Sequence, residues 1–386
     1  MGLFEAFDTV SHQDWIDKIT ADLKGKDYSD TLVWNSNEGI AVLPFYSSNS
    51  SSSTPLKKNS DWKIRETIAI QSIDHANKKA LLALNGGANS LLFLGEVKGQ
   101  SEMDNLLKDI QTDIIDVHFY NPNLQHTLDL TNNIKGSISY DYLGEFLITG
   151  YWNNSQENDI EEIASMTKLD SNMKSITVNG NFYGNVGYSI SQQLALNLSQ
   201  AVEYLNLLTE KGIDAKTVAN KIQFSFSIGS NYFFEIAKLR AARKLWQLIL
   251  EEFNVRDIPM SIHSETSIAD FSDKDNNYNI LRNTTKAMSA ILGGCDSLTI
   301  LAHDNSNERI DFSNRIARNI QHILKEEAFF DKVNNPADGA YFIENLTDEL
   351  SKKAWQFFQD IESQGGFIAC IENGFIKSEL NEPQDA

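Results

Sequence analysis

Short apolar runs alternate with longer segments of helical periodicity from about residue 60 to residue 371. This order is typical of β/α units around a parallel sheet. Eight such units in ~300 residues fit a closed (β/α)8 (TIM) barrel, with a doubly wound open sheet as the alternative α/β fold. The expected strands are Ser90–Leu94, Asp113–Phe119, Gly136–Tyr140, Lys174–Val178, Ile222–Ile228, Ile258–His263, Ser297–Ala302 and Gly366–Ile371.

Two of the intervening helices are well marked by apolar stripes. Phe233–Glu252 carries Ile236, Leu239, Leu245 and Trp246 at helical spacing, and Asn314–Glu327 carries Ile316, Ile320 and Ile323. Such a stripe indicates a helix that packs one face on a core.

One expected strand is unusually polar. Period two places Ser225 and Ser227 on one face and Phe224 and Phe226 on the other. If the serines face the barrel axis, the interior has room for a threaded ligand or buried water. If the phenylalanines face it, the interior is a packed core, and the sequence leaves both readings open.

The first 46 residues are expected to form an arm outside the barrel. Trp15, Ile19 and Leu23 share one helical face, and an extended run follows from Gly39 to Phe45. An arm this short holds no core of its own, so its apolar stripe needs the barrel or a partner chain. The expected domains are the arm at 1–46, a Ser-rich linker at 47–58 and the barrel at 59–386.

Composition narrows the classes of partner. The net charge is −20, from 33 Lys and Arg against 53 Asp and Glu, and no basic run is present, which argues against nucleic acid. Cys295 and Cys370 lack the spacing of a metal site or a disulfide framework. No apolar stretch reaches the ~20 residues that span a bilayer, so we expect a cytoplasmic protein without a membrane partner.

Several segments follow one another in an order that points to a family. They are Asp22–Tyr28, Trp34, Glu38–Ile40 and Pro44–Tyr46 in the arm, and Phe233–Trp246, Arg315–Gln321, Glu326-Glu327, Asn335–Phe342, Glu344–Thr347, Trp355 and Gly365-Gly366 in the barrel. In this order they resemble the adenosylcobalamin-dependent acyl-CoA mutases, and those in the arm resemble the N-terminal extension of methylmalonyl-CoA mutase subunits. The resemblance covers nearly the whole chain.

The resemblance implies a division of labour. In that family the barrel binds a CoA ester along its axis, a separate C-terminal domain holds cobalamin, and the arm helps two subunits to associate. The cobalamin domain is identified by Asp-x-His-x-x-Gly, whose His is the lower axial ligand supported by the Asp. Here the nearest string is Asp116-Val117-His118, inside a barrel strand and without the Gly. We therefore expect no cobalamin on this chain.

The resemblance also indicates missing catalytic groups. It places Lys57 and Ser60 where catalytic members are expected to have Tyr and Arg, and Phe182 where they have a His that bonds the thioester carbonyl. A Thr-x-Gln-Asn-Asp string that helps to hold the substrate acid group is also absent. Losing one preorganised donor costs about 2.7–4 kcal/mol of transition-state stabilisation. The expectation is that this chain has no catalytic residues.

Some site positions persist in altered form. Lys221 stands where catalytic members have Arg, Asp296 and Glu265 each stand where they have Gln, and His263 is retained. Lys221, His263 and Asp296 are thus the candidate vestigial substrate residues, although a lone His at a strand end is more often structural. The charged residues of the strongest motifs are expected to form ion pairs rather than to catalyse; they are Glu235, Arg240, Arg243 and Arg318.

The leading interpretation is a small, non-catalytic subunit of a methylmalonyl-CoA mutase. Its partner in a heterodimer would be a large catalytic subunit that holds adenosylcobalamin and interconverts methylmalonyl-CoA and succinyl-CoA, and without that partner a homodimer is possible. The first alternative is an active acyl-CoA-binding subunit that takes cobalamin from a separate polypeptide. The second is an unrelated enzyme or binding module on the same fold.

Overall fold

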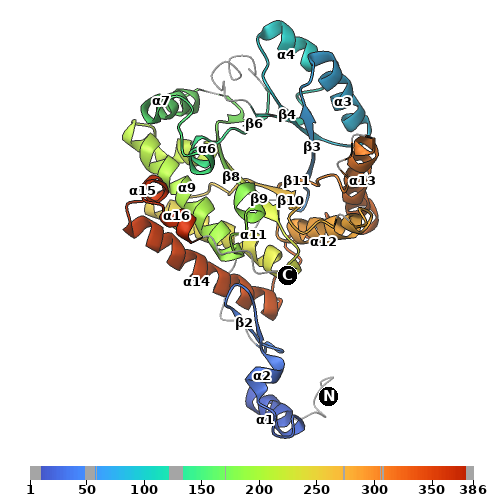
Figure 1. Ribbon diagram of the computed structural model, residues 1–386, viewed down its shortest axis with the longest axis vertical. Helices are drawn as coiled ribbons and strands as arrows, with labels where there is room; N and C mark the ends of the chain where they lie inside the picture. Colours follow the sequence, from blue (N-terminus) through green and yellow to red (C-terminus); the bar gives the residue numbers. More distant parts are fainter. Residues whose placement is uncertain are drawn as a thin grey trace, which may run out of the picture.

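The computed structural model describes residues 10–47, 57, 59–120, 134–169, 171–272, 274–304, 306 and 308–379. Most of the Ser-rich stretch expected as a linker at 47–58 lies outside the described residues. The rest forms a ring of parallel strands surrounded by helices, with an arm that projects away from it (Figure 1).

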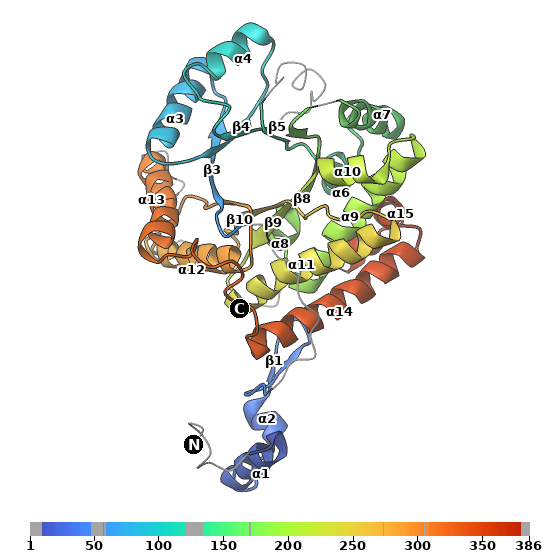
Figure 2. The ribbon, with the colours of Figure 1, turned by 180° about the vertical axis from the view of Figure 1, so that it is seen from behind.

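The ring is the (β/α)8 barrel that the sequence predicts. One nine-stranded sheet runs in the order β7-β6-β5-β4-β3-β11-β10-β9-β8, and every neighbouring pair in it is parallel. Only Ser175 separates β7 from β8; β7 pairs with β6 and β8 with β9, so together they fill one place and close the ring (Figure 2). The strands are β3 (Lys63–Ala69), β4 (Ser90–Leu94), β5 (Asp116–Tyr120), β6 (Gly136–Ile138), β7 (Met173–Lys174), β8 (Ile176–Gly180), β9 (Ile222–Ile228), β10 (Ile262–Thr266) and β11 (Ser297–Thr299).

Helices cover the outside of the ring, and the main core lies between them and the strands. Phe224 of β9 meets Trp246 edge to face, with the ring centroids 4.9 Å apart. The helices are α3 (Ile73–Asn85), α4 (Gln100–Leu106), α6 (Tyr142–Thr149), α7 (Gln156–Thr167), α8 (Asn181–Asn185), α9 (Ile190–Glu210), α10 (Ala215–Lys221), α11 (Tyr232–Glu252), α12 (Tyr278–Leu292), α13 (Ile310–His322), η1 (Ile323–Glu327), α14 (Tyr341–Ser363), α15 (Phe367–Glu372) and α16 (Phe375–Ser378).

One expected strand is wrong and one real strand was missed. Gly366–Ile371 begins a helix, α15, because Gly366 adopts φ +92° and the carboxylate of Glu203 accepts a hydrogen bond from the Phe367 N–H at 2.9 Å. A short apolar run cannot by itself distinguish a buried helix from a strand. The missed strand is β3, whose charged residues hid it: Arg65 points into the barrel, and Glu66 pairs with Arg318 of α13.

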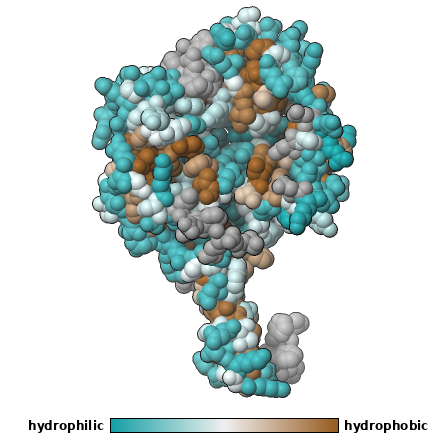
Figure 3. Space-filling model, viewed as in Figure 1, coloured by the Kyte–Doolittle hydropathy of each residue, from teal (hydrophilic) through white to brown (hydrophobic). Residues whose placement is uncertain are grey.

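The arm consists of two helices and a small hairpin. It contains α1 (His12–Asp22), α2 (Tyr28–Leu32), β1 (Trp34–Asn35) and β2 (Ala41–Val42), and the last two pair antiparallel. Helix α1 has no buried residue; Trp15 packs on Phe45 of the arm itself, with the ring centroids 4.8 Å apart. Figure 3 shows the arm standing clear of the barrel, with hydrophobic residues at the neck.

The hairpin turn fastens the arm to the barrel. Ile40 is buried against Phe234 and Leu350 in a small core of its own. The carboxylate of Glu38 accepts hydrogen bonds from the N–H groups of Ile190 and Ser191, at 2.6 and 2.9 Å, at the first turn of α9. A carboxylate in this position satisfies orphan donors and faces the positive end of the helix dipole.

Glu38→Ala is expected to loosen the arm. Loss of this cap should cost about 1–2 kcal/mol of local stability. Hydrogen exchange of the hairpin, residues 34–42, should become faster while exchange of the barrel strands stays the same. Asp17→Ala on the exposed face of α1 serves as the control, and unchanged exchange in Glu38→Ala would show that the carboxylate is not the fastener.

Candidate functional site: the barrel interior and its two rims

The interior of the barrel is polar. Phe224 points outward to Trp246, so alternation turns Gln223, Ser225 and Ser227 toward the axis. This settles the open question about β9 in favour of the serines. Figure 3 shows hydrophilic side chains in the hollow at the centre of this face.

Hydrogen bonds link side chains of four strands into one interior chain. Nη2 of Arg65 lies 2.8 Å from Nε2 of His118, whose Nδ1 lies 2.7 Å from Oγ of Ser137. Ser137 in turn donates to Oε1 of Gln223 at 2.9 Å. Because a guanidinium can only donate, Nε2 of His118 must accept and its proton sits on Nδ1. Burial, with the Arg65 charge beside it, lowers the pKa of His118 well below its usual value, so this imidazole stays neutral.

A second cluster lies on β10 and its neighbours. Nδ1 of His263 lies 2.9 Å from Oγ of Ser297, and burial lowers the pKa of His263 well below its usual value. Glu265, two residues further along β10, lies within 3.5 Å of Nδ2 of Asn181. Burial raises the pKa of Glu265 to about 7, against the opposing attraction of Arg65. Burial lowers the pKa of Arg65 itself to about 9.

The three candidate substrate residues lie on or just before three adjacent strands but do not converge on one point. His263 lies inside the barrel, while Lys221 and Asp296 precede β9 and β11 at the amino-terminal rim. Nζ of Lys221 donates to the carbonyl of Ser171 at 2.7 Å, and Asp296 accepts from Nη2 of Arg243 at 3.0 Å. Their charges are thus engaged by the chain itself, and a role in substrate binding remains a prediction for all three.

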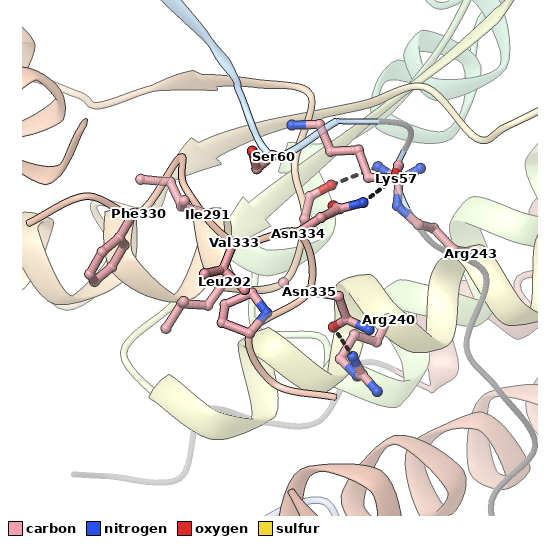
Figure 4. Close-up of a pocket in the computed structure, with 13 residues that line it drawn as sticks. Lys57, Ser60, Arg240, Arg243, Ile291, Leu292, Phe330, Val333, Asn334 and Asn335 are labelled. Carbon is pink, nitrogen blue, oxygen red and sulfur yellow. Dashed lines mark hydrogen bonds between the residues drawn. The ribbon is translucent and has the colours of Figure 1, made fainter. Parts of the chain in front are cut away.

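Lys57 and Ser60 also lie at the amino-terminal rim (Figure 4). Nζ of Lys57 donates to the carbonyl of Cys295 at 2.7 Å, and Oγ of Ser60 donates to the carbonyl of Asp331. Burial lowers the pKa of Lys57. Both side chains therefore tie the segment before β3 to neighbouring loops.

Phe182 lies at the opposite rim. It follows the carboxyl end of β8 in α8, half-buried, with its ring edge to face with that of Tyr183. Barrel strands rise ~3.3 Å per residue, so one small reacting group cannot touch both Phe182 and Lys57. Of the positions that motivated the non-catalytic interpretation, Phe182 is the one at the carboxyl rim, where barrel enzymes place their chemistry.

The four motif residues that were expected to form ion pairs, Glu235, Arg240, Arg243 and Arg318, all do so. Glu235 pairs with Lys238 at 2.6 Å, Arg243 with Asp296, and Arg318 with Glu66. Arg240 of α11 pairs with Glu344 of α14 and so joins two of the longest helices. These contacts agree with the expectation of structural roles.

The His of the string nearest to the cobalamin motif, His118, lies inside the barrel. Its side chain is 3% exposed and both of its ring nitrogens are engaged, by Arg65 and Ser137, so this His is not free to act as an axial ligand. Within the described ranges no group of three or more His, Cys, Asp or Glu side chains could hold a metal ion. No described helix is long and apolar enough to cross a membrane.

Sequence reasoning missed the interior chain of Arg65, Ser137 and Gln223. In the sequence, His118 stands out only as part of an incomplete cobalamin motif. The alternating polar residues of β9 were the one signal available, because inward positions of barrel strands repeat with period two.

Comparisons with known proteins agree with this geometry. The family model described as methylmalonyl-CoA mutase matches residues 97–385. The methylmalonyl-CoA mutase small subunit of Porphyromonas gingivalis is 35% identical over 98% of this chain and 67% of its own length. The large subunit of the same organism is 34% identical over 64% of this chain and 36% of its own length.

The chain spans about two thirds of that small subunit and about a third of that large subunit. A solved dihydropteroate synthase from Yersinia pestis shares 11% identity and a TM-score of 0.39 over 70% of this chain and 94% of its own, a likeness too low to support an argument. The family match extends over most of the barrel, and the small-subunit match also includes the arm. The chain belongs to the methylmalonyl-CoA mutase family.

Proposed function

We propose that this chain is the small, non-catalytic subunit of a methylmalonyl-CoA mutase. Residues 1–46 would form the arm that associates with a large subunit, and that subunit would hold adenosylcobalamin and carry out the rearrangement. The similarity to a small subunit over nearly the whole chain, in an organism that also has a large subunit, supports this assignment.

One observation carries the non-catalytic part of the proposal. Phe182 occupies the carboxyl rim of the barrel, and a phenyl ring can neither donate a hydrogen bond to a thioester carbonyl nor accept one. Inside the barrel, Arg65 is engaged by His118 and Gln223 by Ser137. A ligand threaded along the axis would have to break these bonds before it could make its own.

Exposed residues of the arm support the proposed association with a large subunit. Helix α1 buries nothing on the barrel, and Trp34 and Phe45 are 52% and 41% exposed. Aromatic side chains exposed on a projecting element are typical of a surface that another protein covers.

The test combines a binding measurement on the purified chain with a co-expression experiment. Titration calorimetry with methylmalonyl-CoA up to millimolar concentration is expected to show no binding. Co-expression with a large subunit of the family is expected to give a stable complex, and Trp15→Ala with Phe45→Ala should weaken that complex without unfolding the barrel. Asp17→Ala on the same helix serves as the matched surface control.

A saturable calorimetric signal for methylmalonyl-CoA would contradict the proposal. It would instead favour the alternative, an active acyl-CoA-binding subunit that uses cobalamin from another polypeptide. The polar groups inside the barrel favour this alternative, because barrels that bind substrates also have polar groups in their sites.

A further inference from the structure

The barrel wall is thinly paired between β3 and β11, a boundary that we call the seam. Strand β3 pairs with β4 along five positions but with β11 along only two, Lys63 with Ser297 and Ile64 with Leu298. Beyond Ile64 the backbone ladder between the two strands ends, although Oγ1 of Thr299 still donates to the carbonyl of Arg65 at 3.3 Å. The helices that follow them, α3 and α13, flank the seam, and Figure 2 shows the two helices on the same side of the ring.

A cavity of about 650 Å³ fills the space between these helices over the seam. This volume falls in the range of ~300–1,000 Å³ that is common for small-ligand sites. A smaller hollow shares six of its lining residues and continues toward Arg65. The apolar part of the wall consists of Ile68, Ala69, Leu82, Ala83, Leu94, Leu301, Ala302 and Ile310.

Side chains of the two helices form ion pairs along the cavity wall. Lys79 of α3 pairs with Asp311 of α13, and Arg318 of α13 pairs with Glu66 and donates to the carbonyl of Gly86 at 3.2 Å. A Cβ on Gly86 would lie 2.6 Å from Nε of Arg318, so this glycine is what lets the guanidinium approach the end of α3.

The charge of the wall is opposite to that of the whole chain. Lys79, Arg315 and Arg318 give three positive charges against two negative ones from Glu66 and Asp311, so the wall carries one net positive charge in a chain of net −20. That extra charge belongs to Arg315, which is exposed and lies 5.3 Å from the centroid of the Phe312 ring.

The floor has polar groups that the seam leaves open. The side chain of Thr67 shares the inward face of β3 with Arg65, so the backbone of this strand supplies these groups. The N–H of Lys63 donates to Asp296 beside β11, whereas the carbonyl of Ile64 accepts from Asn89 beside β4. Alternate residues of a parallel strand bond to opposite neighbours, so the peptide groups of Thr67 face the seam, where pairing with β11 has ended.

We infer that this cavity binds a small amphiphilic anion. Its apolar body lies over Ile68, Ala83 and Leu301, and its acid group meets Arg315 at the mouth, because the charge of Lys79 is already matched by Asp311. The cavity opens on the outer side of the barrel wall between α3 and α13, and Arg315 does not line the axis, so the inference does not depend on whether the chain is catalytic.

The test uses two fluorescent probes with the same aromatic body. 1-Anilinonaphthalene-8-sulfonate carries an acid group, and N-phenyl-1-naphthylamine lacks it. The sulfonate is expected to bind at one site per chain and several-fold more tightly than the uncharged probe. Octanoate and octyl phosphate should displace the sulfonate probe, while octanol should not. Whichever of the two anions displaces it at the lower concentration shows whether a carboxylate or a phosphate is preferred.

Variants locate the site. Arg315→Glu should weaken binding of the sulfonate several-fold and leave the uncharged probe unaffected. Leu82→Glu, at a side chain that is 64% exposed and so tolerant of change, should weaken both probes, and Ala83→Phe should abolish binding by filling the cavity. Arg256→Glu is the matched charge reversal on an exposed residue after α11.

Equal affinity for the two probes would overturn the inference, as would sulfonate binding that Arg315→Glu and Arg256→Glu weaken alike. The melting temperature of each variant shows whether it is folded, and Arg315→Glu and Leu82→Glu decide the question even if Ala83→Phe fails to fold. None of these outcomes changes with the result of the methylmalonyl-CoA titration.

Discussion

Glu235→Leu is expected to destabilise the barrel by about 3–5 kcal/mol, because it leaves a buried ammonium group without its counter-charge. Lys238 is fully buried and lies 2.6 Å from the Glu235 carboxylate, which also accepts from the N–H of Gly229 at 2.9 Å. The remaining partners of the ammonium group are the carbonyl of Ser227 and the side-chain oxygen of Gln193, both neutral. Urea unfolding followed by circular dichroism measures the loss.

The double variant Glu235→Leu with Lys238→Met is the control. Apolar side chains of similar size in place of a buried ion pair are often neutral or stabilising, so this protein should recover most of the lost stability. The single variant Lys238→Met completes a double-mutant cycle, and the three free-energy changes together give the coupling energy of the pair. A double variant as unstable as the single one would show that packing, and not the unpaired charge, causes the loss.

Glu265→Gln is expected to stabilise the protein by about 3 kcal/mol at pH 8. Burial raises the pKa of this carboxyl to about 7 from the ordinary value of 4.5, and each tenfold change in a proton-binding constant corresponds to about 1.4 kcal/mol. A Gln keeps the shape and the hydrogen-bonding capacity toward Asn181 without the cost of a buried charge. It is also the residue that the catalytic members of the family are expected to have at this position.

The pH dependence gives the sign of this effect. The folded carboxyl holds its proton more tightly than the unfolded one, so its contribution to stability is complete below about pH 4.5 and is lost as the pH rises through 7. The advantage of Glu265→Gln over the wild type should therefore grow from about 1 kcal/mol at pH 5.5 to about 3 kcal/mol at pH 8. Comparing the two proteins at the same pH cancels the opposite contribution of the buried histidines.

Glu252→Gln, at an exposed carboxylate of α11, is the control and should change little at either pH. A stabilisation of Glu265→Gln that does not vary between pH 5.5 and pH 8 would contradict the raised pKa. Loss of stability at pH 8 would show that the attraction between Glu265 and Arg65 outweighs the cost of burial.

The barrel was predictable because its pattern is local. Strands β4 and β9 were expected with the bounds that they have, and α11 was expected to begin one residue later than it does. These elements were predictable because an apolar run or stripe depends only on residues close together in the sequence. The wrong and missed strand assignments occur where contacts with residues distant in the sequence determine the local structure. Gly366–Ile371 forms a helix whose first turn is held by Glu203, and β3 carries charges that only Arg318 and His118 make tolerable.

The candidate site, too, was predictable from the sequence only in part. Membership of the family and the parallel β/α order could be predicted from the chain alone, because both depend only on which residues follow one another. The loss of a catalytic imidazole at Phe182 stays a prediction. Only the tertiary structure decided that Lys57 and Phe182 stand at opposite rims, that serines line the axis and that the wall is thinly paired between β3 and β11. These features depend on which strands become neighbours when the ring closes, and no single segment contains that information.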